Sequence, residues 1–258
     1  MIQLRLAATA LLAGIALAAC GPTEDGQLAA CGGNDAPAAA QTGGGLSIQP
    51  LQFTCKKLEN GLRVYAMPDA NTASVSVAVW YDVGSKDDPQ GRSGFAHLFE
   101  HLMFKSTTNM PPETFDRLTE DAGGFNNAST WNDFTNYYGS VPANHLERVL
   151  WGEAERMGSL VIDDANFKSE RDVVKEEFRQ SILSNPYGKL LGLYLYQSGF
   201  NVHPYGRPGI GSIEDLDAAT VEAVRAFHAA YYRPDNAILV VSGNFTEAQL
   251  DGYVKKYF

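Results

Sequence analysis

Basic side chains are scarce in this 258-residue chain, which has 20 Lys and Arg residues against 30 Asp and Glu residues and a formal net charge of −10. A surface that binds phosphate groups needs an excess of Lys and Arg, so this balance argues against a nucleic-acid partner. The chain also has no internal repeat and no regular βαβ alternation. Its hydrophobic residues, which make up 45% of the chain, are sufficient to form a buried core.

A long apolar run occurs only near the N-terminus, at residues 6–19. The run is too short for a comfortable transmembrane helix but fits the hydrophobic region of a secretory signal. It ends in Leu17-Ala18-Ala19-Cys20, which resembles the bacterial lipobox, where the chain is cut before the cysteine and that cysteine is lipidated. We therefore predict a lipoprotein signal peptide at 1–19 and a membrane anchor at Cys20, with an ordinary signal peptide as the alternative. Because Gly21 rather than Asp follows, the predicted location is the bacterial cell envelope, at the outer membrane and facing the periplasm.

Cysteine is rare, with three residues in the whole chain. Cys31 lies in a stretch at 20–49 that is rich in Ala, Gly, Pro and Gln and has no apolar periodicity, which predicts a flexible tether. Cys55 lies near the start of the folded part. An oxidising periplasm would allow the two to pair. Because they lie in very different segments, however, unpaired thiols are favoured over a disulfide, and a metal site at these cysteines is favoured least.

The sequence from residue 50 to 258 has the periodicities of a single folded domain. Glu59-Asn60-Gly61 between two extended runs predicts a β-hairpin, and alternating apolar residues at 74–81 predict a strand with one buried face. A predicted helix at 95–104 is so apolar that it must be buried, so any polar side chain on it needs a partner. The other predicted strands are 51–54, 62–67, 130–141 and 237–241, and the other predicted helices are 113–122, 145–160, 166–183, 190–196, 221–232 and 247–257. This mixture predicts an α+β fold, with a mostly antiparallel sheet covered by helices.

The most informative string is His97-Leu98-Phe99-Glu100-His101. Residues four apart lie on the same face of a helix, so the two imidazoles can share one metal ion. A zinc ion with three protein ligands keeps its fourth position for a water molecule, whose pKa it lowers towards about 7. Glu100 is close enough to take the proton as that water attacks a carbonyl, and to deliver it to the leaving amine.

The alternative to a metal site is a pair of helix histidines with a chance glutamate beside them. Random placement of the five histidines and the glutamates of this chain would produce the spacing about 0.005 times. A buried apolar helix also has no structural use for two histidines and a glutamate. The string therefore favours a metal centre.

A third ligand is sought among the carboxylates of the predicted helix 166–183, because a peptidase zinc usually binds one carboxylate. Glu170 and Glu177 are seven residues apart and face the same way, whereas Glu176 points about 100 degrees away from Glu177. Periodicity alone does not choose between Glu176 and Glu177. A solvated helix face with many carboxylates is the ordinary explanation of such a run.

The order His-x-x-Glu-His inverts the commoner His-Glu-x-x-His and is the signature of the pitrilysin/insulinase family of zinc peptidases, the inverzincins. This chain resembles the N-terminal catalytic lobe of that family from about residue 51 to 258. The further matching segments are 58–64, 94–107, 123–124, 127–130, 135–138, 203–211 and several positions within 227–237.

The resemblance implies a role for residues that periodicity leaves open. The family's spacing puts the third ligand 76 residues after His101, which is Glu177, and gives Glu170 a supporting role behind the ligands. Glu176 is then a neighbour without a metal role. The resemblance also implies that a peptide binds in extended form along an edge strand, through main-chain hydrogen bonds. The residues of that strand are Asn127, Ala128, Ser129 and Thr130.

By the same resemblance, the chain binds one zinc ion and hydrolyses peptide bonds in extended peptides or unfolded proteins as an endopeptidase, with Glu100 as general base. Members of the family generally use two or more such lobes, so we predict a second lobe as partner, from a separate chain or by self-association. One alternative is a non-catalytic assembly lobe of a two-lobe complex. Another is a metal-binding or lipid-anchored binding protein without catalysis. Such a protein would not need the Glu100 carboxylate beside the metal.

Overall fold

The computed structural model describes residues 29–31 and 51–258, and the described residues form a seven-stranded sheet in the order β1-β2-β3-β7-β4-β6-β5. The strands are β1 (Ala29–Ala30), β2 (Thr54–Lys57), β3 (Arg63–Pro68), β4 (Ser74–Tyr81), β5 (Phe125–Thr130), β6 (Thr135–Pro142) and β7 (Ala237–Gly243). Neighbouring strands are antiparallel except β3 and β7, which run parallel. The predicted signal peptide, the predicted anchor at Cys20 and most of the predicted tether lie outside the described residues.

One face of the sheet is buried and the other is more open. In β4 the odd-numbered residues from 75 to 81 are buried, whereas Ser76 and Trp80 are exposed. The same alternation occurs in β7, as expected of strands whose side chains point to opposite faces in turn. The buried side chains join those of the helices in one continuous core. The prediction of a mostly antiparallel sheet covered by helices is therefore confirmed.

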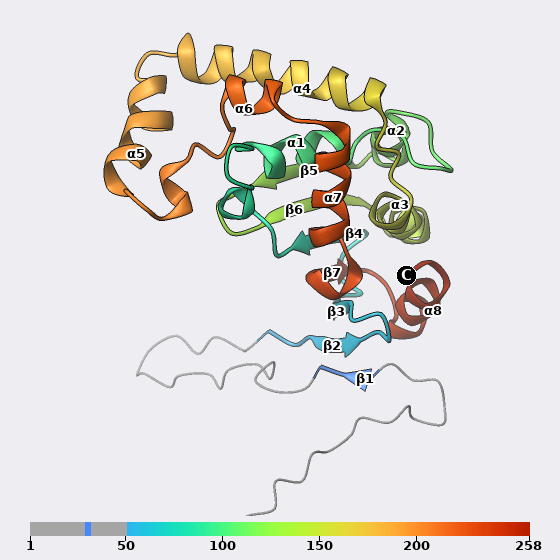
Figure 1. The fold of residues 1–258 in the computed structure, drawn as a ribbon. Helices are drawn as coiled ribbons and strands as arrows, with labels where there is room; N and C mark the ends of the chain where they lie inside the picture. The colour runs from blue at the N-terminus through green and yellow to red at the C-terminus, as the bar shows by residue number, and fades with distance from the viewer. Residues whose placement is uncertain (1–28, 32–50) are drawn as a thin grey trace, which may run out of the picture.

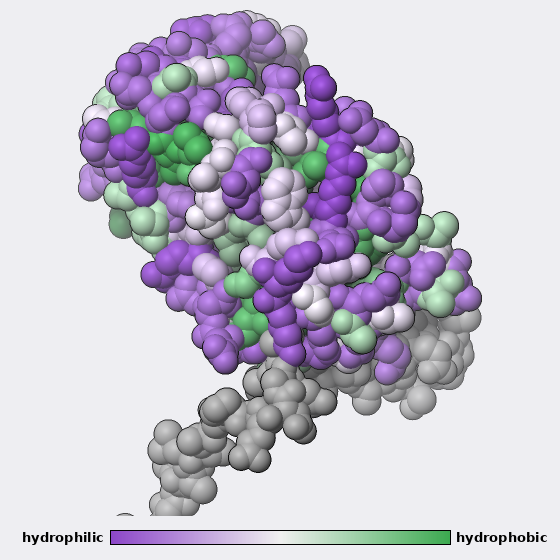
Figure 2. All heavy atoms as spheres, turned by 90° about the vertical axis from the view of Figure 1, so that its right-hand side faces the viewer, coloured by the Kyte–Doolittle hydropathy of each residue, from purple (hydrophilic) through white to green (hydrophobic). Residues whose placement is uncertain are grey.

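The helices lie around the sheet as Figure 1 shows, with α4 beyond the β5 end and β1 and β2 at the opposite end. The α-helices are α1 (Phe95–Leu102), α2 (Thr114–Glu120), α3 (Leu146–Gly158), α4 (Asp164–Phe178), α5 (Leu195–Gly199), α6 (Ile213–Asp217), α7 (Val221–Tyr231) and α8 (Glu247–Tyr257). The 3-10 and π turns are η1 (Ser85–Asp87), η2 (Ala143–His145), η3 (Arg179–Leu183), η4 (Leu190–Tyr194), η5 (Pro204–Gly206) and η6 (Pro234–Asn236). The face on which α3 and α8 lie is mostly hydrophilic, with small separate apolar areas (Figure 2).

Two predicted strands differ from the observed ones. The hairpin around Asn60-Gly61 forms, but its first strand, β2, begins at Thr54 rather than at residue 51. The segment predicted as one strand at 130–141 belongs to a hairpin, in which β5 ends at Thr130 and β6 begins at Thr135. The residues between these strands include Asn132-Asp133, which are typical of turns, in a segment otherwise rich in strand-forming aromatic residues.

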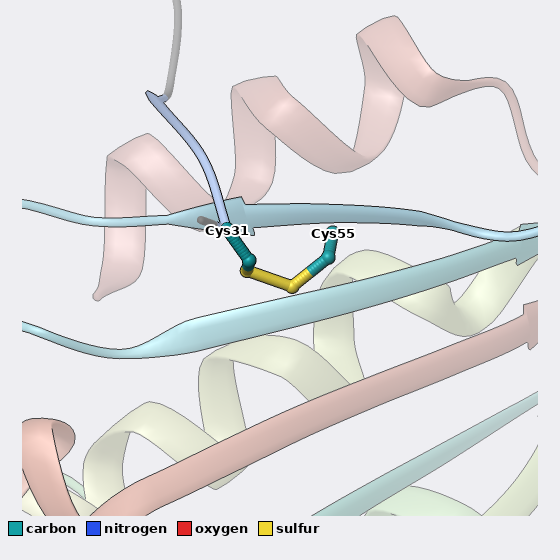
Figure 3. The surroundings of a disulfide bond; sticks show 2 residues. All are labelled: Cys31 and Cys55. Atoms are coloured by element: carbon teal, nitrogen blue, oxygen red, sulfur yellow. A yellow bond between two sulfur atoms is a disulfide. The ribbon is translucent and has the colours of Figure 1, made fainter. Parts of the chain in front are cut away.

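The cysteines of the tether and of the fold form a disulfide. Cys31 and Cys55 are bonded, with their Cα atoms 5.4 Å apart, and the N–H of Cys31 donates to the carbonyl of Cys55 at 3.2 Å (Figure 3). The sequence-based preference for unpaired thiols is therefore wrong. The physical reason is that β1 pairs with β2 as an added edge strand, which brings a segment without apolar periodicity against the fold.

A buried ion pair lies on helix α3. Arg156 is only 1% exposed, and its Nε and Nη2 donate to both carboxylate oxygens of Glu153, which is 2% exposed. The guanidinium carbon lies 3.8 Å from the ring centroid of Phe115 and 4.6 Å from that of Tyr137. The hydroxyl of Tyr137 donates to the carbonyl of Phe99, within α1, at 3.2 Å. The ion pair thus supports the helix through the Tyr137 ring.

Large exposed apolar side chains concentrate in the segment 183–202, which contains nine of the fourteen found in the described residues. Lys189 is the only charged residue of this segment. Gly192 packs against Ile182, so η3 and η4 lie side by side. Exposed apolar surfaces of this kind mark interaction sites. Within the described part of the chain, no helix combines the length and the apolar character needed to cross a membrane.

Candidate metal centre

Helix α1 presents both histidines of the His-x-x-Glu-His string on one face. The other faces are apolar and buried, and Phe95 and Phe99 pack against Phe227 of α7. This packing leaves His97 and His101 on the remaining face, with their ring centroids 4.9 Å apart. The spacing of four residues therefore brings the two imidazoles together, as the sequence predicts.

Helix α4 brings Glu177 to the same point. Its Oε2 atom lies 3.4 Å from Nε2 of His101 and 3.7 Å from Nε2 of His97. One donor atom from each of the three residues lies within 4.8 Å of the others. Tetrahedral zinc ligands at about 2.1 Å from the ion stand about 3.4 Å apart, which is close to the distances of 3.4 and 3.7 Å from Glu177 to the two histidines. Two imidazoles and a carboxylate are also a donor set of catalytic zinc sites.

The surroundings of the three side chains favour the protonation states that bind a cation. Burial lowers the pKa of His97, and so does the neighbouring His101, while Glu177 and Glu100 oppose this shift. A hydrogen bond with His101 lowers the pKa of Glu177, and burial opposes it. Zinc binds the neutral imidazole and the ionised carboxylate, so both shifts prepare the site for the metal.

Glu170 lies behind the three candidate ligands. It is 5% exposed, and its Oε1 forms an ion pair with Lys105 Nζ at 2.8 Å and accepts a hydrogen bond from Ser169 Oγ at 3.1 Å. Its Oε2 is 3.7 Å from Nδ1 of His101. A carboxylate on this side of an imidazole favours a proton on Nδ1 and leaves Nε2 free for a metal. Glu170 therefore has the geometry of the supporting role that the resemblance implies.

Glu176 and Glu100 differ in their position relative to the candidate ligands. Glu176 turns away from the histidines and accepts hydrogen bonds from Arg179 and Gln180, each at 3.2 Å, on the exposed side of the helix. Glu100 lies on α1 between the two histidines, and its charge partly opposes the lowering of the His97 pKa. Glu100 is thus next to the site without being one of the three converging donors.

The predicted peptide-binding residues all lie in β5, the end strand of the sheet among the described residues. The N–H of Ala128 donates to Asn127 Oδ1 at 2.8 Å, which indicates that this N–H faces the open edge. Helix α1 packs against β5. The open edge is therefore beside the helix that carries the histidines.

Two residues to which the sequence analysis assigned no role support the elements that build this centre. Lys105, which forms an ion pair with Glu170, lies beyond the end of α1 at Leu102, so helical spacing gave no signal for it. Asp88 accepts hydrogen bonds from the N–H groups of Gly94 and Ala96 at the start of α1. Burial raises the pKa of Asp88 to about 7, against the lowering effect of these two hydrogen bonds. No local pattern marks Asp88, because it lies outside the helix that it contacts.

Two histidines from one helix and a glutamate from another, with a further glutamate beside them, are the arrangement of zinc peptidases as a class. Residues 63–212 match the model described as insulinase (peptidase family M16), and residues 218–258 match that of the peptidase M16 inactive domain. The first match covers more than half of the chain, so the chain belongs to peptidase family M16, the insulinase family.

Individual relatives agree with this assignment. The chain is 38% identical over 202 residues to the zinc protease PqqE of Helicobacter pylori, a match that covers 78% of this chain and 45% of that protein. It is 34% identical over 203 residues to the uncharacterized zinc protease ML0855 of Mycobacterium leprae, with the same two coverages of 78% and 45%. The chain thus spans about half the length of the curated relatives that it matches.

Solved structures show the same fold. A protease from Helicobacter pylori superimposes with a TM-score of 0.77 at 37% identity, and the match covers 80% of this chain and 50% of that one. Pitrilysin superimposes with a TM-score of 0.72 at 24% identity, over 80% of this chain and 22% of its own. The prediction of a single lobe of the pitrilysin/insulinase type is therefore confirmed.

Proposed function

We propose that this chain is the catalytic lobe of a zinc endopeptidase that hydrolyses peptide bonds in extended peptides or unfolded proteins. The observation that carries the proposal is the convergence of His97, His101 and Glu177, whose donor atoms lie within 4.8 Å of one another. Membership of a family whose relatives are named zinc proteases supports it. Glu100 beside these donors favours catalysis over the alternative of a non-catalytic assembly lobe, which has no use for it.

The proposed mechanism gives separate roles to the metal, to Glu100 and to Glu170. Zinc held by the three converging donors would supply a Lewis acid, which polarises the substrate carbonyl and acidifies the attacking water. Glu100 takes a proton from the attacking water and delivers it to the amine of the leaving peptide. Glu170, fixed by Lys105, faces Nδ1 of His101 and keeps Nε2 directed at the ligand cluster.

The proposed substrate binds along the open edge of β5. An extended peptide can pair there with backbone groups such as the N–H of Ala128, and α1 places the reacting groups beside that edge. A folded protein cannot bind in this way, because most of its backbone N–H and C=O groups are already paired. The proposed substrates are therefore unfolded or extended segments.

Removal of zinc should abolish hydrolysis, and one equivalent of zinc should restore it. The protein is treated with a chelator, dialysed, and then titrated with zinc while cleavage of a quenched fluorescent peptide library is followed. Magnesium serves as the matched control, because it prefers oxygen ligands and octahedral geometry and should restore nothing at a site with two imidazoles. Hydrolysis that continues in the zinc-free protein would contradict the proposal.

The zinc titration also tests whether activity requires a second lobe as partner. The exposed apolar segment 183–202 and the greater length of the relatives support the proposal that a second lobe of the same type covers part of this chain. Protein that binds one zinc ion but cleaves no peptide would favour the assembly-lobe alternative, or a catalytic lobe that needs its partner. Addition of a second lobe would then separate these two, since only a catalytic lobe gains an activity that depends on Glu100.

Replacing Ala128 with proline should raise the KM for an extended peptide about tenfold, because proline removes the N–H that is proposed to pair with substrate. Proline is tolerated in an edge strand when its nitrogen faces the open side, so the fold should persist. The measurement is steady-state kinetics, with melting temperature and zinc content as controls. An unchanged KM in a folded, zinc-loaded variant would exclude pairing at this position.

A further inference from the structure

The metal-bearing helix begins without a side-chain cap of its own. The residue before α1 is Gly94, whose φ of +94 degrees is left-handed and which has no side chain to accept a hydrogen bond. The first N–H groups of a helix have no partner within the helix, and a buried helix end needs acceptors from elsewhere. Helix α1 is buried, so another part of the chain must supply them.

Asp88 supplies these acceptors. Its Oδ2 accepts from the N–H of Gly94 at 2.7 Å, and its Oδ1 accepts from the N–H of Ala96 at 2.9 Å. The side chain is only 4% exposed, so both oxygens form hydrogen bonds with the helix rather than with solvent. A carboxylate at this position also interacts favourably with the positive end of the helix dipole.

The segment that carries Asp88 is itself fixed to the turn between β5 and β6. The N–H of Ser85 donates to the carbonyl of Trp131, and the N–H of Lys86 donates to the carbonyl of Asn132, each at 3.0 Å. Asp88 therefore connects the first turn of α1 to the end of the strand on which substrate is proposed to bind. The two hydrogen bonds from α1 to Asp88 are short and buried.

We propose that Asp88 is a positioning residue of the metal centre, which sets the place of His97 relative to its partner ligands and to the β5 edge. Ala96, held by Asp88, directly precedes His97, so a rotation of the first helical turn moves the imidazole with it. The inference rests on the proposed function, because a precise place for His97 has a consequence only if the residue binds zinc. Asp88 touches neither metal nor substrate and acts through the helix.

Asp215 offers a matched comparison at the same end of the helix. Its Oδ2 accepts from the N–H of Ser93 at 2.9 Å and from the Ser93 hydroxyl at 2.5 Å, which lie before the first turn. Both carboxylates therefore stabilise the same corner of the fold, but only Asp88 bonds a residue next to a ligand. A purely structural role predicts similar consequences for the loss of either one.

The experiment compares Asp88→Asn with Asp215→Asn in the full chain. An asparagine at 88 accepts from one N–H and turns its own N–H₂ group towards the other. We expect the zinc dissociation constant of Asp88→Asn, measured by competition with a chromogenic chelator, to rise about 10- to 100-fold. The absorption spectrum of the cobalt-loaded variant should shift as well. Asp215→Asn should keep the wild-type zinc affinity and cobalt spectrum.

A second variant distinguishes a loss of positioning from simple unfolding as the cause of weaker zinc binding. Asp88→Glu keeps the charge and both acceptor oxygens, and it should restore a zinc affinity closer to that of the wild type than Asp88→Asn does. Equal zinc affinities of wild type and Asp88→Asn would overturn the inference, and so would an equal loss in Asp215→Asn or no recovery in Asp88→Glu. Failure of the wild-type chain to bind zinc would instead overturn the proposed function, so the two failures are distinguishable.

Discussion

Replacing Glu100 with glutamine should reduce peptide hydrolysis about a thousandfold while one zinc ion per chain stays bound. The amide keeps the size of the carboxylate but cannot accept a proton, and a positioned general base contributes about 10² to 10⁴ in rate. The three converging donors are unchanged in this variant, so metal affinity should persist. Initial rates on a quenched fluorescent peptide and zinc content by atomic absorption measure the two effects.

Glu176→Gln is the matched control for this substitution. It makes the same chemical change directly beside Glu177, but at a side chain that contacts Arg179 and Gln180 rather than the histidines. Its hydrolysis rate should therefore equal that of the wild type. If Glu100→Gln also kept the wild-type rate with zinc bound, another group would have to be the general base.

Replacing Glu153 with glutamine should lower the free energy of unfolding by about 3–5 kcal/mol, the cost of leaving one member of a buried ion pair without its partner. Arg156 is always charged and 1% exposed, and the substitution would leave its charge among aromatic rings and one neutral amide, with no carboxylate to balance it. Denaturant titration with and without the substitution measures the loss.

Glu120→Gln provides the same chemical change at an exposed position of α2, and it should leave the unfolding curve nearly unchanged. A loss in Glu153→Gln no larger than in this control would show that the Arg156 charge is neutralised in another way. The double variant Glu153→Leu with Arg156→Met should recover much of the lost stability, because well-packed apolar groups often replace a buried ion pair at little cost.

The parts of the fold that local patterns specify could be predicted from the sequence. The strand predicted at 74–81 and the helix predicted at 247–257 coincide with β4 and α8. In β4 every second residue is apolar, and in α8 Thr246 and Gln249 form a capping box that fixes the first turn. His97, Glu100 and His101 were predictable for the same reason, because their relation depends on the geometry of one helix.

Features that depend on contacts between distant residues could not be predicted in this way. Periodicity relates Glu176 to Glu177 on their own helix but does not say which of them faces α1, and only the family resemblance chose between them. Asp88 contacts the metal helix from a separate segment, so nothing in its local sequence marks it as a cap. The parallel pairing of β3 with β7 likewise joins residues 175 positions apart, such as Val64 and Leu239.

The disulfide between Cys31 and Cys55 closes a covalent ring in the polypeptide, since the two residues are 24 positions apart in the chain. One broken peptide bond within this ring opens it without releasing a fragment, because the sulfur bridge still joins the two pieces. A molecule nicked there migrates as full-length protein on a denaturing gel until a reductant is added. On such a gel, protease damage in this stretch therefore becomes visible after reduction.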